Sequence, residues 1–198
     1  MTVEEAVKTR RSIRKYKNIP VPKELVERIL QAGMMAPSSK NRQPWKFIVV
    51  SGQAKKDVLK RMEEGLKRER ISPLIPESAP YISGSEYTLK VMNEASVVVF
   101  IVNPLAVKIG DAVSDDARIS EICNAQSVGA AIENMTLTAT ELGLGSLWIC
   151  DTFFAQKELD QWLGEKGELY AALALGYAEE APHARPRKAY SDVVEWRT

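Results

Sequence analysis

The chain has 198 residues, of which 45% are hydrophobic and 27% are charged, and its formal net charge is +1. This length and composition are typical of a folded globular protein with a substantial core, which excludes disordered, coiled-coil and collagen-like classes. The near-neutral charge argues against a nucleic-acid-binding module. No apolar run has the length of a membrane helix, and the N-terminus lacks a signal peptide's apolar stretch. We therefore expect one cytoplasmic domain over residues 1–198, without nucleic-acid or membrane partners.

Two helices are predicted in the first forty residues. Thr2 and Glu5 have the spacing of a capping box, which predicts a short helix that ends near Arg10. After Pro22, apolar residues recur at helical spacing, and proline is tolerated in a first helical turn. The second helix therefore begins near Pro22 and ends before Pro37.

The next part of the chain alternates between loops, strands and a surface helix. The segment "PSSKNRQPW" consists of turn residues, and "KFIVVSG" after it predicts a buried strand. Residues 53–70 have one apolar face, as a surface helix does. Residues 71–90 begin with several prolines and show no clear period, so we expect an irregular segment and a candidate lid. "SVVVFIV" predicts a central strand.

The second half of the chain predicts a long helix and two further strands. Residues 116–142 have a helical pattern with apolar positions on more than one face, which predicts a helix buried on several sides. "SLWIC" predicts a strand, "AQKELDQWLG" a short helix, and "LYAALALGYA" a strand that ends at a glycine.

The last residues, 178–198, have little of their own to pack against. They contain two prolines and the apolar side chains Val193, Val194 and Trp196. Such a tail is either disordered or lies across another surface, and the apolar residues favour a partner subunit in a symmetric dimer.

Several kinds of catalytic site are absent from the sequence. There is one histidine, His183, which excludes a histidine-rich metal site within one chain, so we expect no metal. The chain has no Walker loop, and its "GLG" follows a helix where a dinucleotide fingerprint follows a strand. The two cysteines, Cys123 and Cys150, have no CxxC spacing, and both are expected to be buried thiols.

Basic residues form two clusters at opposite ends of the chain. If folding joins them, they can grip one dianion, because arginine binds phosphate oxygens bidentately and a serine adds a hydroxyl donor. The alternative is two solubilising runs, and composition alone does not choose between them. The clusters contain Arg10, Arg11, Ser12, Arg14, Lys15 and Lys17, and later Arg185, Arg187 and Lys188.

The loop after the second helix carries hydroxyl and amide groups beside an aromatic ring. Ser38, Ser39, Asn41 and Gln43 precede Trp45. Short polar side chains in a turn can hydrogen-bond the edge of a planar heterocycle, although the same residues are ordinary turn formers. Both interpretations remain open at the level of composition.

Four motifs occur in an order that resembles the nitroreductase family of flavin-dependent oxidoreductases. They are "RRSIRKY", "VPKELVERILQAGMMAPSSKNRQPWKFIVV", "GAAIENMTLTATELGLGSLWI", and "LALGY" with a late "RPRK". The resemblance spans nearly the whole chain. It implies an α+β fold with a mixed central sheet between helical layers, an intertwined homodimer in which tails 178–198 embrace the partner, and FMN at the dimer interface.

The resemblance also implies the cofactor-binding residues, and it assigns no catalytic side chain because FMN carries the chemistry. The implied residues are Arg10, Arg11, Ser12 and Arg14 for the phosphate and ribityl chain, Arg185 and Arg187 for the same phosphate, Pro37, Ser38, Ser39 and Asn41 reaching across from the other subunit, and Trp148, Ile149 and Cys150 beside the ring.

The sequence departs from the family pattern in two places. Cys150 and Asp151 stand where small residues are common in the family. An asparagine that contacts the flavin pyrimidine in larger relatives has no clear counterpart, and Lys90 and Asn93 are possible replacements.

The implied activity is hydride transfer from NADH or NADPH to flavin N5 and then to a small acceptor, such as a nitroaromatic or a quinone, with ping-pong kinetics. Reductive dehalogenation and flavin fragmentation are alternatives on the same scaffold, with residues 71–90 recognising the substrate as a lid. A non-enzymatic flavin-storage or redox-sensing protein is the third possibility.

Overall fold

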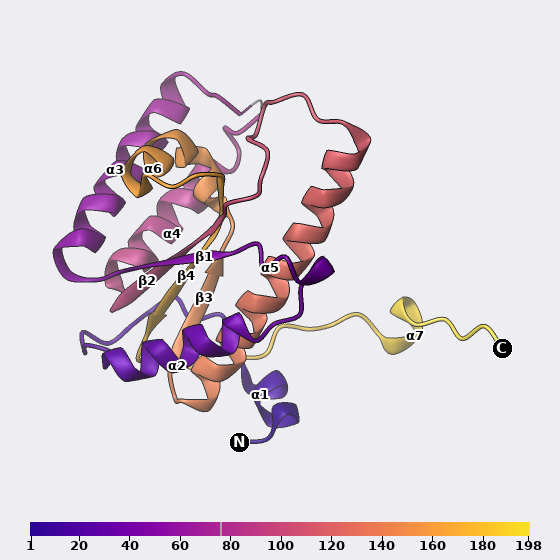
Figure 1. Ribbon diagram of the computed structural model, residues 1–198. Coiled ribbons are helices and arrows are strands. Elements are labelled where there is room, and N and C mark those ends of the chain that lie inside the picture. The colour runs from indigo at the N-terminus through magenta and orange to yellow at the C-terminus, as the bar shows by residue number, and fades with distance from the viewer. Residues whose placement is uncertain (76) are drawn as a thin grey trace.

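Four apolar segments form one sheet with the strand order β1-β2-β4-β3 (Figure 1). The computed structural model describes residues 1–75 and 77–198. The strands are β1 (Lys46–Val50), β2 (Val97–Asn103), β3 (Gly145–Ile149) and β4 (Glu168–Gly176). β2 is buried along its whole length, because it is a central strand and helices cover both faces of the sheet. All four strands that the sequence predicts are confirmed.

The α+β class is confirmed, but the sheet differs from the mixed one that we expected. Each of the pairs β1–β2, β2–β4 and β3–β4 is antiparallel. Parallel pairing occurs among the described residues as an isolated bridge between Ser12 and Ser146. The sheet has no parallel strand here because the N-terminal segment, among the described residues, contacts the outer edge of β3 at a single position and forms no strand of its own.

One face of the sheet is covered by α3 (Gly52–Ile71), α4 (Ile82–Glu94) and α6 (Gln156–Leu163), with the short helix η2 (Asp151–Ala155) beside them (Figure 1). Side chains alternate between the two faces of a strand, so every second residue of β2 points to this layer. The core here includes Val98, Phe100 and Val102 from β2 and Leu147 and Ile149 from β3.

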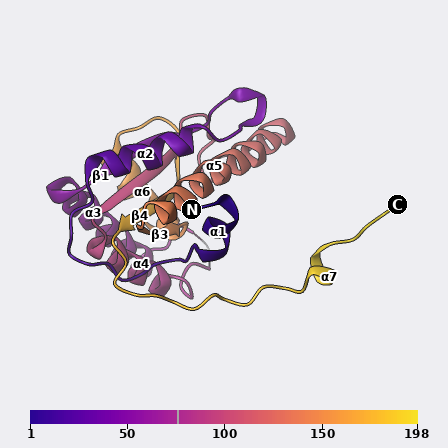
Figure 2. The same cartoon turned by 90° about the horizontal axis from the view of Figure 1, so that it is seen from below.

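The opposite face is covered by α2 (Lys23–Met34) and the long helix α5 (Asp115–Glu141), which pack against each other (Figures 1 and 2). The remaining apolar residues of β2, Val97, Val99 and Ile101, belong to this core. Together the two helical layers and the sheet form the three-layer arrangement that the resemblance implies.

Two expectations about helices need correction. Residues 71–90 are not irregular throughout, because α4 begins at Ile82, and its buried residues pack against α3 and η2. Pro76, within the candidate lid, lies outside the described residues. In α5, the C-terminal half is buried on several sides, but Ile119 and Ile122 near its beginning are exposed. They lie beyond the part of α5 whose residues are buried against the sheet.

The two ends of the chain differ in how they are held. Helix α1 (Val3–Thr9) has the predicted capping box between Thr2 and Glu5 and packs against α5. The C-terminal tail runs away from the body as an extended chain with one short helix, α7 (Tyr190–Val193), as Figure 2 shows. In the part of the chain that the structure describes, no helix combines the length and apolar character needed to cross a membrane.

Candidate functional site

The first basic cluster is held against the beginning of β3. The Ile13 N–H donates to the Ser146 carbonyl at 2.9 Å, and the buried Ile13 side chain lies against Gly145. A Cβ atom at Gly145 would lie 2.9 Å from Ile13 Cγ1, so glycine allows this close approach. The Tyr16 hydroxyl donates to the Ile13 carbonyl at 2.9 Å and closes the turn. The segment is therefore anchored by the buried side chains of Ile13 and Tyr16, while the basic residues around them remain near the surface.

The chain that leaves β4 runs antiparallel to this segment and brings the second basic cluster to it. The Lys17 N–H donates to the Tyr177 carbonyl at 2.8 Å, and the Glu179 N–H donates to the Lys15 carbonyl at 3.0 Å. The Glu180 carboxylate accepts from the N–H groups of Arg14 and Lys15. Residues that are 160 or more positions apart in sequence therefore lie side by side.

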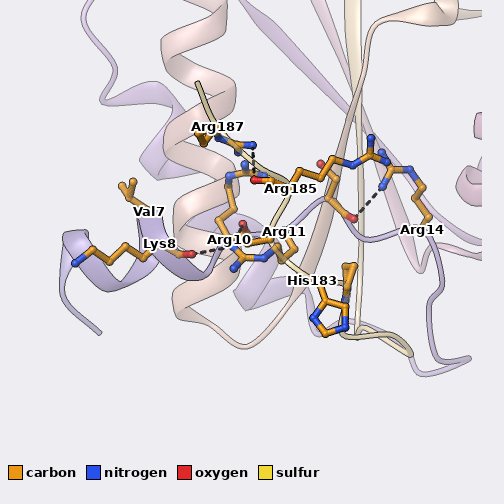
Figure 3. A pocket seen from close by; sticks show the side chains of 11 residues that line it. Val7, Lys8, Arg10, Arg11, Arg14, His183, Arg185 and Arg187 are labelled. Atoms are coloured by element: carbon orange, nitrogen blue, oxygen red, sulfur yellow. Dashed lines mark hydrogen bonds between the residues drawn. The ribbon is translucent and has the colours of Figure 1, made fainter. Parts of the chain in front are cut away.

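A cavity of about 400 Å³ lies between the two basic clusters (Figure 3). Six of its lining side chains are cationic, and no carboxylate lines it. The lining residues are Val7, Lys8, Arg10, Arg11, Ser12, Arg14, Pro182, His183, Ala184, Arg185 and Arg187. We call this site the basic cavity.

The charge of the basic cavity is largely uncompensated. Arg11 donates to the Lys8 carbonyl at 2.8 Å, Arg14 to the Ser12 carbonyl at 3.2 Å, and Arg187 to the Arg185 carbonyl at 3.2 Å. Carbonyl acceptors occupy only part of the five donors of a guanidinium and leave its charge in place. Two cations are exceptions: Lys8 pairs with Glu4, and the Arg10 Nε lies 3.6 Å from Glu133 Oε1. The cavity is thus complementary to an anion such as a phosphate monoester.

A second cavity, of about 440 Å³ and mostly apolar, lies at the other end of β3. Trp148 forms part of its wall, and Gly129 of α5 faces the indole: a Cβ there would lie 3.5 Å from Trp148 Cη2. The lining residues are Val107, Ile109, Glu121, Ile122, Ala125, Val128, Gly129, Ile132, Trp148, Cys150, Phe153, Glu168, Tyr170 and Ala171. We call this site the apolar cavity.

The resemblance places Trp148, Ile149 and Cys150, at the end of β3, beside the flavin ring, but their side chains do not all point the same way. Trp148 and Cys150 line the apolar cavity, but the Ile149 side chain is 2% exposed and belongs to the core under α3 and α6. Side chains alternate along a strand, so only the main chain of Ile149 can face this cavity. Cys150 is exposed, which corrects its expected burial, and Cys123 is half-buried. Partial desolvation and then the charge of Asp151 raise the pKa of the Cys150 thiol, so the thiol is protonated at neutral pH.

The serine loop is ordered but lines neither cavity of its own chain. It contains the short helix η1 (Ser39–Asn41). The Ser39 N–H donates to Ser127 Oγ of α5 at 3.2 Å, and the Gln43 N–H donates to Ser38 Oγ at 2.9 Å. Lys40 and Asn41 have φ values of 53° and 52°, so tertiary contacts hold a backbone conformation that non-glycine residues rarely adopt. Within one chain, the loop that includes Pro37 and Ser38 is not brought to the basic cavity.

The departures from the family pattern have structural explanations. Asp151 joins η2 to α4: its side chain accepts from Thr88 Oγ1 at 3.1 Å, and its carbonyl accepts from Ser85 Oγ at 2.8 Å. Burial raises the pKa of the Asp151 carboxyl. Lys90 is exposed, and the Asn93 side chain donates to the carbonyl one turn before it in α4. Neither of these replacement candidates lines the two cavities.

Two polar residues that line the apolar cavity, Glu168 and Tyr170, were not predicted from the sequence. The Tyr170 hydroxyl donates to Glu121 Oε2 and accepts from Asn103 Nδ2, the latter at 2.8 Å. Burial and then the hydrogen bond to Glu121 raise the pKa of the Tyr170 hydroxyl. Glu168 begins β4 and is buried. One feature of the sequence could have indicated Glu168: it is a charged residue at the beginning of the apolar strand segment "ELYAALALG". Among the described residues, no group of three or more potential ligands is placed to hold a metal ion.

Sequence similarity to known proteins identifies a family for this chain. The family model described as "Nitroreductase family" matches residues 7–177. A protein of Methanothermobacter thermautotrophicus, provisionally named NADH dehydrogenase/NAD(P)H nitroreductase, is 35% identical over 150 residues, which are 75% of this chain and 60% of that relative. The matched region thus spans less than two thirds of that relative.

Two solved structures have the same fold. A BluB-like flavoprotein from Clostridium difficile has a TM-score of 0.79 and 27% identity, and the match covers 100% of both chains. The FMN and NADPH-dependent nitroreductase NfnB from a Sphingopyxis strain has a TM-score of 0.78 at 19% identity, again over 100% of both chains. The chain therefore belongs to the nitroreductase family, which confirms the resemblance of its motifs.

Proposed function

We propose that this chain is an FMN-dependent oxidoreductase that passes reducing equivalents from NADH or NADPH to a small acceptor such as a nitroaromatic or a quinone. The observation that carries this proposal is the joining of the two basic clusters around one cavity without a carboxylate in its lining. Family membership and the FMN dependence of the nitroreductase NfnB support the same choice of cofactor. A cytoplasmic location stays a prediction.

The positions of the two cavities along β3 support FMN as the ligand. Ser12, in the basic cavity, pairs with Ser146 of β3, whereas Trp148 and Cys150 line the apolar cavity. A strand rises about 3.3 Å per residue, so Trp148 and Cys150 lie about 7 and 13 Å beyond Ser146. An elongated ligand with a dianionic end and a planar, largely apolar end fits this arrangement.

Different residues of the chain would bind the phosphate and the ring of FMN. Arg14 and Arg187 hold the phosphate through charge-assisted hydrogen bonds, and Ser12 adds a hydroxyl donor. Trp148, which lies against Gly129, forms one wall of the apolar cavity that would take the planar ring, and the apolar lining excludes water. When bound, FMN supplies the capacity to take two electrons from a nicotinamide and pass them on. Because donor and acceptor would occupy the same cavity in turn, we expect ping-pong kinetics.

The proposal includes a homodimer in which each subunit completes the site of the other. The serine loop, with Ser38, Ser39 and Asn41, lines neither cavity of its own chain and would contact the flavin bound by the partner. The tail extends away from the body, and its Trp196 is 79% exposed (Figure 2). An exposed apolar tail of this kind gains stability by lying on a second copy.

The phosphate assignment is tested by replacing Arg14 or Arg187 with alanine and titrating the apo-protein with FMN. A charge-assisted hydrogen bond contributes about 1.5–3 kcal/mol, so each variant should bind FMN about 10- to 150-fold more weakly. Arg61→Ala is the matched control, because Arg61 lies on α3 in the opposite layer and pairs with Glu64 on the surface. Unchanged FMN affinity in both cavity variants would refute the assignment.

The enzyme class is tested by a visible spectrum of the purified protein and anaerobic titration with each nicotinamide. Steady NAD(P)H oxidation with a quinone or nitroaromatic is the expected result. A flavin that is bound but never turned over would indicate a storage or redox-sensing protein. Release of halide from a halogenated aromatic, or loss of the flavin spectrum in air, would instead indicate the dehalogenase or flavin-fragmenting alternative.

A further inference from the structure

Glu168 lies between the apolar cavity and a third, more polar cavity of about 390 Å³, and its side chain lines both. The polar cavity also contains Lys108, Lys157 and Asp160. Glu168 itself is 3% exposed. Ile109, Phe153 and Glu168 line both cavities, so Glu168 contributes the one carboxyl group to the wall between a surface cleft with charged residues and the proposed reaction site.

The hydrogen bonding of Glu168 is incomplete. Its Oε1 accepts from the Ile109 N–H at 3.3 Å, and its buried Oε2 has no hydrogen-bond partner among the described residues. An ionised carboxylate with an unpaired buried oxygen is unfavourable, whereas a protonated carboxyl becomes a donor that can serve a ligand. Burial raises the pKa of the Glu168 carboxyl, against the opposing effect of the Ile109 N–H.

The charged groups around Glu168 come from three other elements. Asp160 of α6 raises its pKa, and so does Asp111 of the loop between β2 and α5, while Lys108 of that loop lowers it. Glu121 of α5 faces the same apolar cavity. The balance of these groups adds to the effect of burial and favours the neutral acid.

The other acidic and phenolic groups of the apolar cavity are already paired. Glu121 accepts from Tyr170 through Oε2 and from the Val107 N–H through Oε1 at 3.3 Å. The Tyr170 proton is thus committed to Glu121. Two glutamates line the apolar cavity, Glu121 and Glu168. Among the described residues, only Glu168 of this pair has a side-chain oxygen without a hydrogen-bond partner.

We propose that Glu168 is the proton donor to the acceptor in the apolar cavity and is reprotonated from the polar cavity. This inference rests on the proposed function. Reduction of a quinone to a hydroquinone takes up two electrons and two protons. A bound flavin reduced by NAD(P)H would supply both electrons and one proton as a hydride equivalent. The second proton comes from Glu168, whose O–H bond breaks as the quinone oxygen is protonated, and water at Asp160 and Lys108 returns a proton to the carboxylate.

The experiment uses the flavin-loaded full chain and follows its two half-reactions separately by anaerobic stopped-flow. In Glu168→Gln, reduction by NADH or NADPH should keep the wild-type rate, while reoxidation by benzoquinone should slow about 10²- to 10⁴-fold, which is the usual contribution of a general acid. The wild-type reoxidation rate should fall as pH rises through the elevated pKa of Glu168, because only the protonated form donates. In the glutamine variant this dependence should disappear.

Two further variants distinguish a proton-donor role of Glu168 from a general effect of the substitution. Glu165→Gln is the matched control, because Glu165 is near in sequence but pairs with Lys46 at 2.6 Å on the surface; both of its half-reactions should be unchanged. Glu168→Asp retains an acid on a shorter side chain and should restore part of the rate together with the pH dependence. It also serves if the glutamine variant does not fold.

A readout that needs no turnover is the infrared spectrum of the apo-protein. A protonated carboxyl band should be present at neutral pH in the wild type and in Glu165→Gln and absent from Glu168→Gln. Equal reoxidation rates at every pH, or no band that depends on Glu168, would overturn the proton-donor role even if the protein reduces quinones. Failure of the wild type to bind flavin or to accept electrons from either nicotinamide would overturn the proposed function, and the role of Glu168 with it.

Discussion

Replacement of Glu69 by glutamine removes the carboxylate that ties down the beginning of the candidate lid, residues 71–90. Glu69 lies on α3 and is 1% exposed. It accepts from the N–H groups of Leu74 and Ile75, both at 2.9 Å, and pairs with Arg68. The end of α3 and the chain that follows it are therefore joined through one buried charge.

The expected loss of unfolding free energy in Glu69→Gln depends on which interactions the partners of Glu69 keep. Arg68 keeps its bidentate pair with Glu158, at 2.7 and 3.0 Å, so it is not left without a partner. The full cost of breaking a buried ion pair, about 3–5 kcal/mol, is therefore an upper bound. Weakened bonds to Leu74 and Ile75 should leave a loss of about 2–4 kcal/mol, or about 4–16 °C in Tm for a domain of this size.

The destabilisation caused by Glu69→Gln should be larger at neutral pH than in acid. Burial raises the pKa of the Glu69 carboxyl, but the hydrogen bonds from Leu74, Ile75 and Arg68 outweigh it and hold the pKa below its ordinary value. A folded-state pKa below the unfolded one stabilises the protein above the unfolded pKa, and this stabilisation disappears as pH falls through the folded value. The difference between wild type and Glu69→Gln should thus shrink in acid.

The assay is urea unfolding of wild type and variant in steps from about pH 7 to about pH 3, across the ordinary glutamate pKa. Glu63→Gln is the matched control: it lies on the same helix, but its pair with Lys67 is exposed, and no resolvable change is expected. Amide exchange at Leu74 and Ile75 should quicken only in Glu69→Gln. A loss equal to that of the control, or one independent of pH, would refute the reasoning.

Two further predictions concern packing and assembly. Gly65→Ala should destabilise the protein by about 1–3 kcal/mol in the same urea assay, because the new Cβ would lie 2.6 Å from Ala155 Cβ. Gly84→Ala is its control: nothing lies within 4 Å of that position in α4, so the variant should be neutral or stabilised by up to about 1 kcal/mol, and an equal loss in both would contradict the packing argument. Deletion of residues 189–198 spares both basic clusters and should give a monomer by sedimentation; a stable yellow dimer would show that the tail is dispensable for assembly.

The local elements were predictable because their signals lie within a few residues of one another. The capping box at Thr2, the apolar period of α2 and the β-branched run of β2 each depend on neighbours along the chain. Helix α4 was missed because the prolines that precede it obscure a helix whose residues Val91 and Met92 are buried only in the assembled core. Its formation is decided by packing against α3 and η2 more than by its own pattern.

By itself, the sequence determined the two basic clusters, the order of four motifs and hence the family. Only the tertiary structure decided that Arg14 and Arg187 line one cavity, that Ile149 points away from the site, and that Glu168 stands between two cavities. The physical reason is the range of the interactions. Helix and strand signals act between near neighbours, whereas the site depends on sheet order, strand facing and the antiparallel return of the chain after β4, which no local pattern contains.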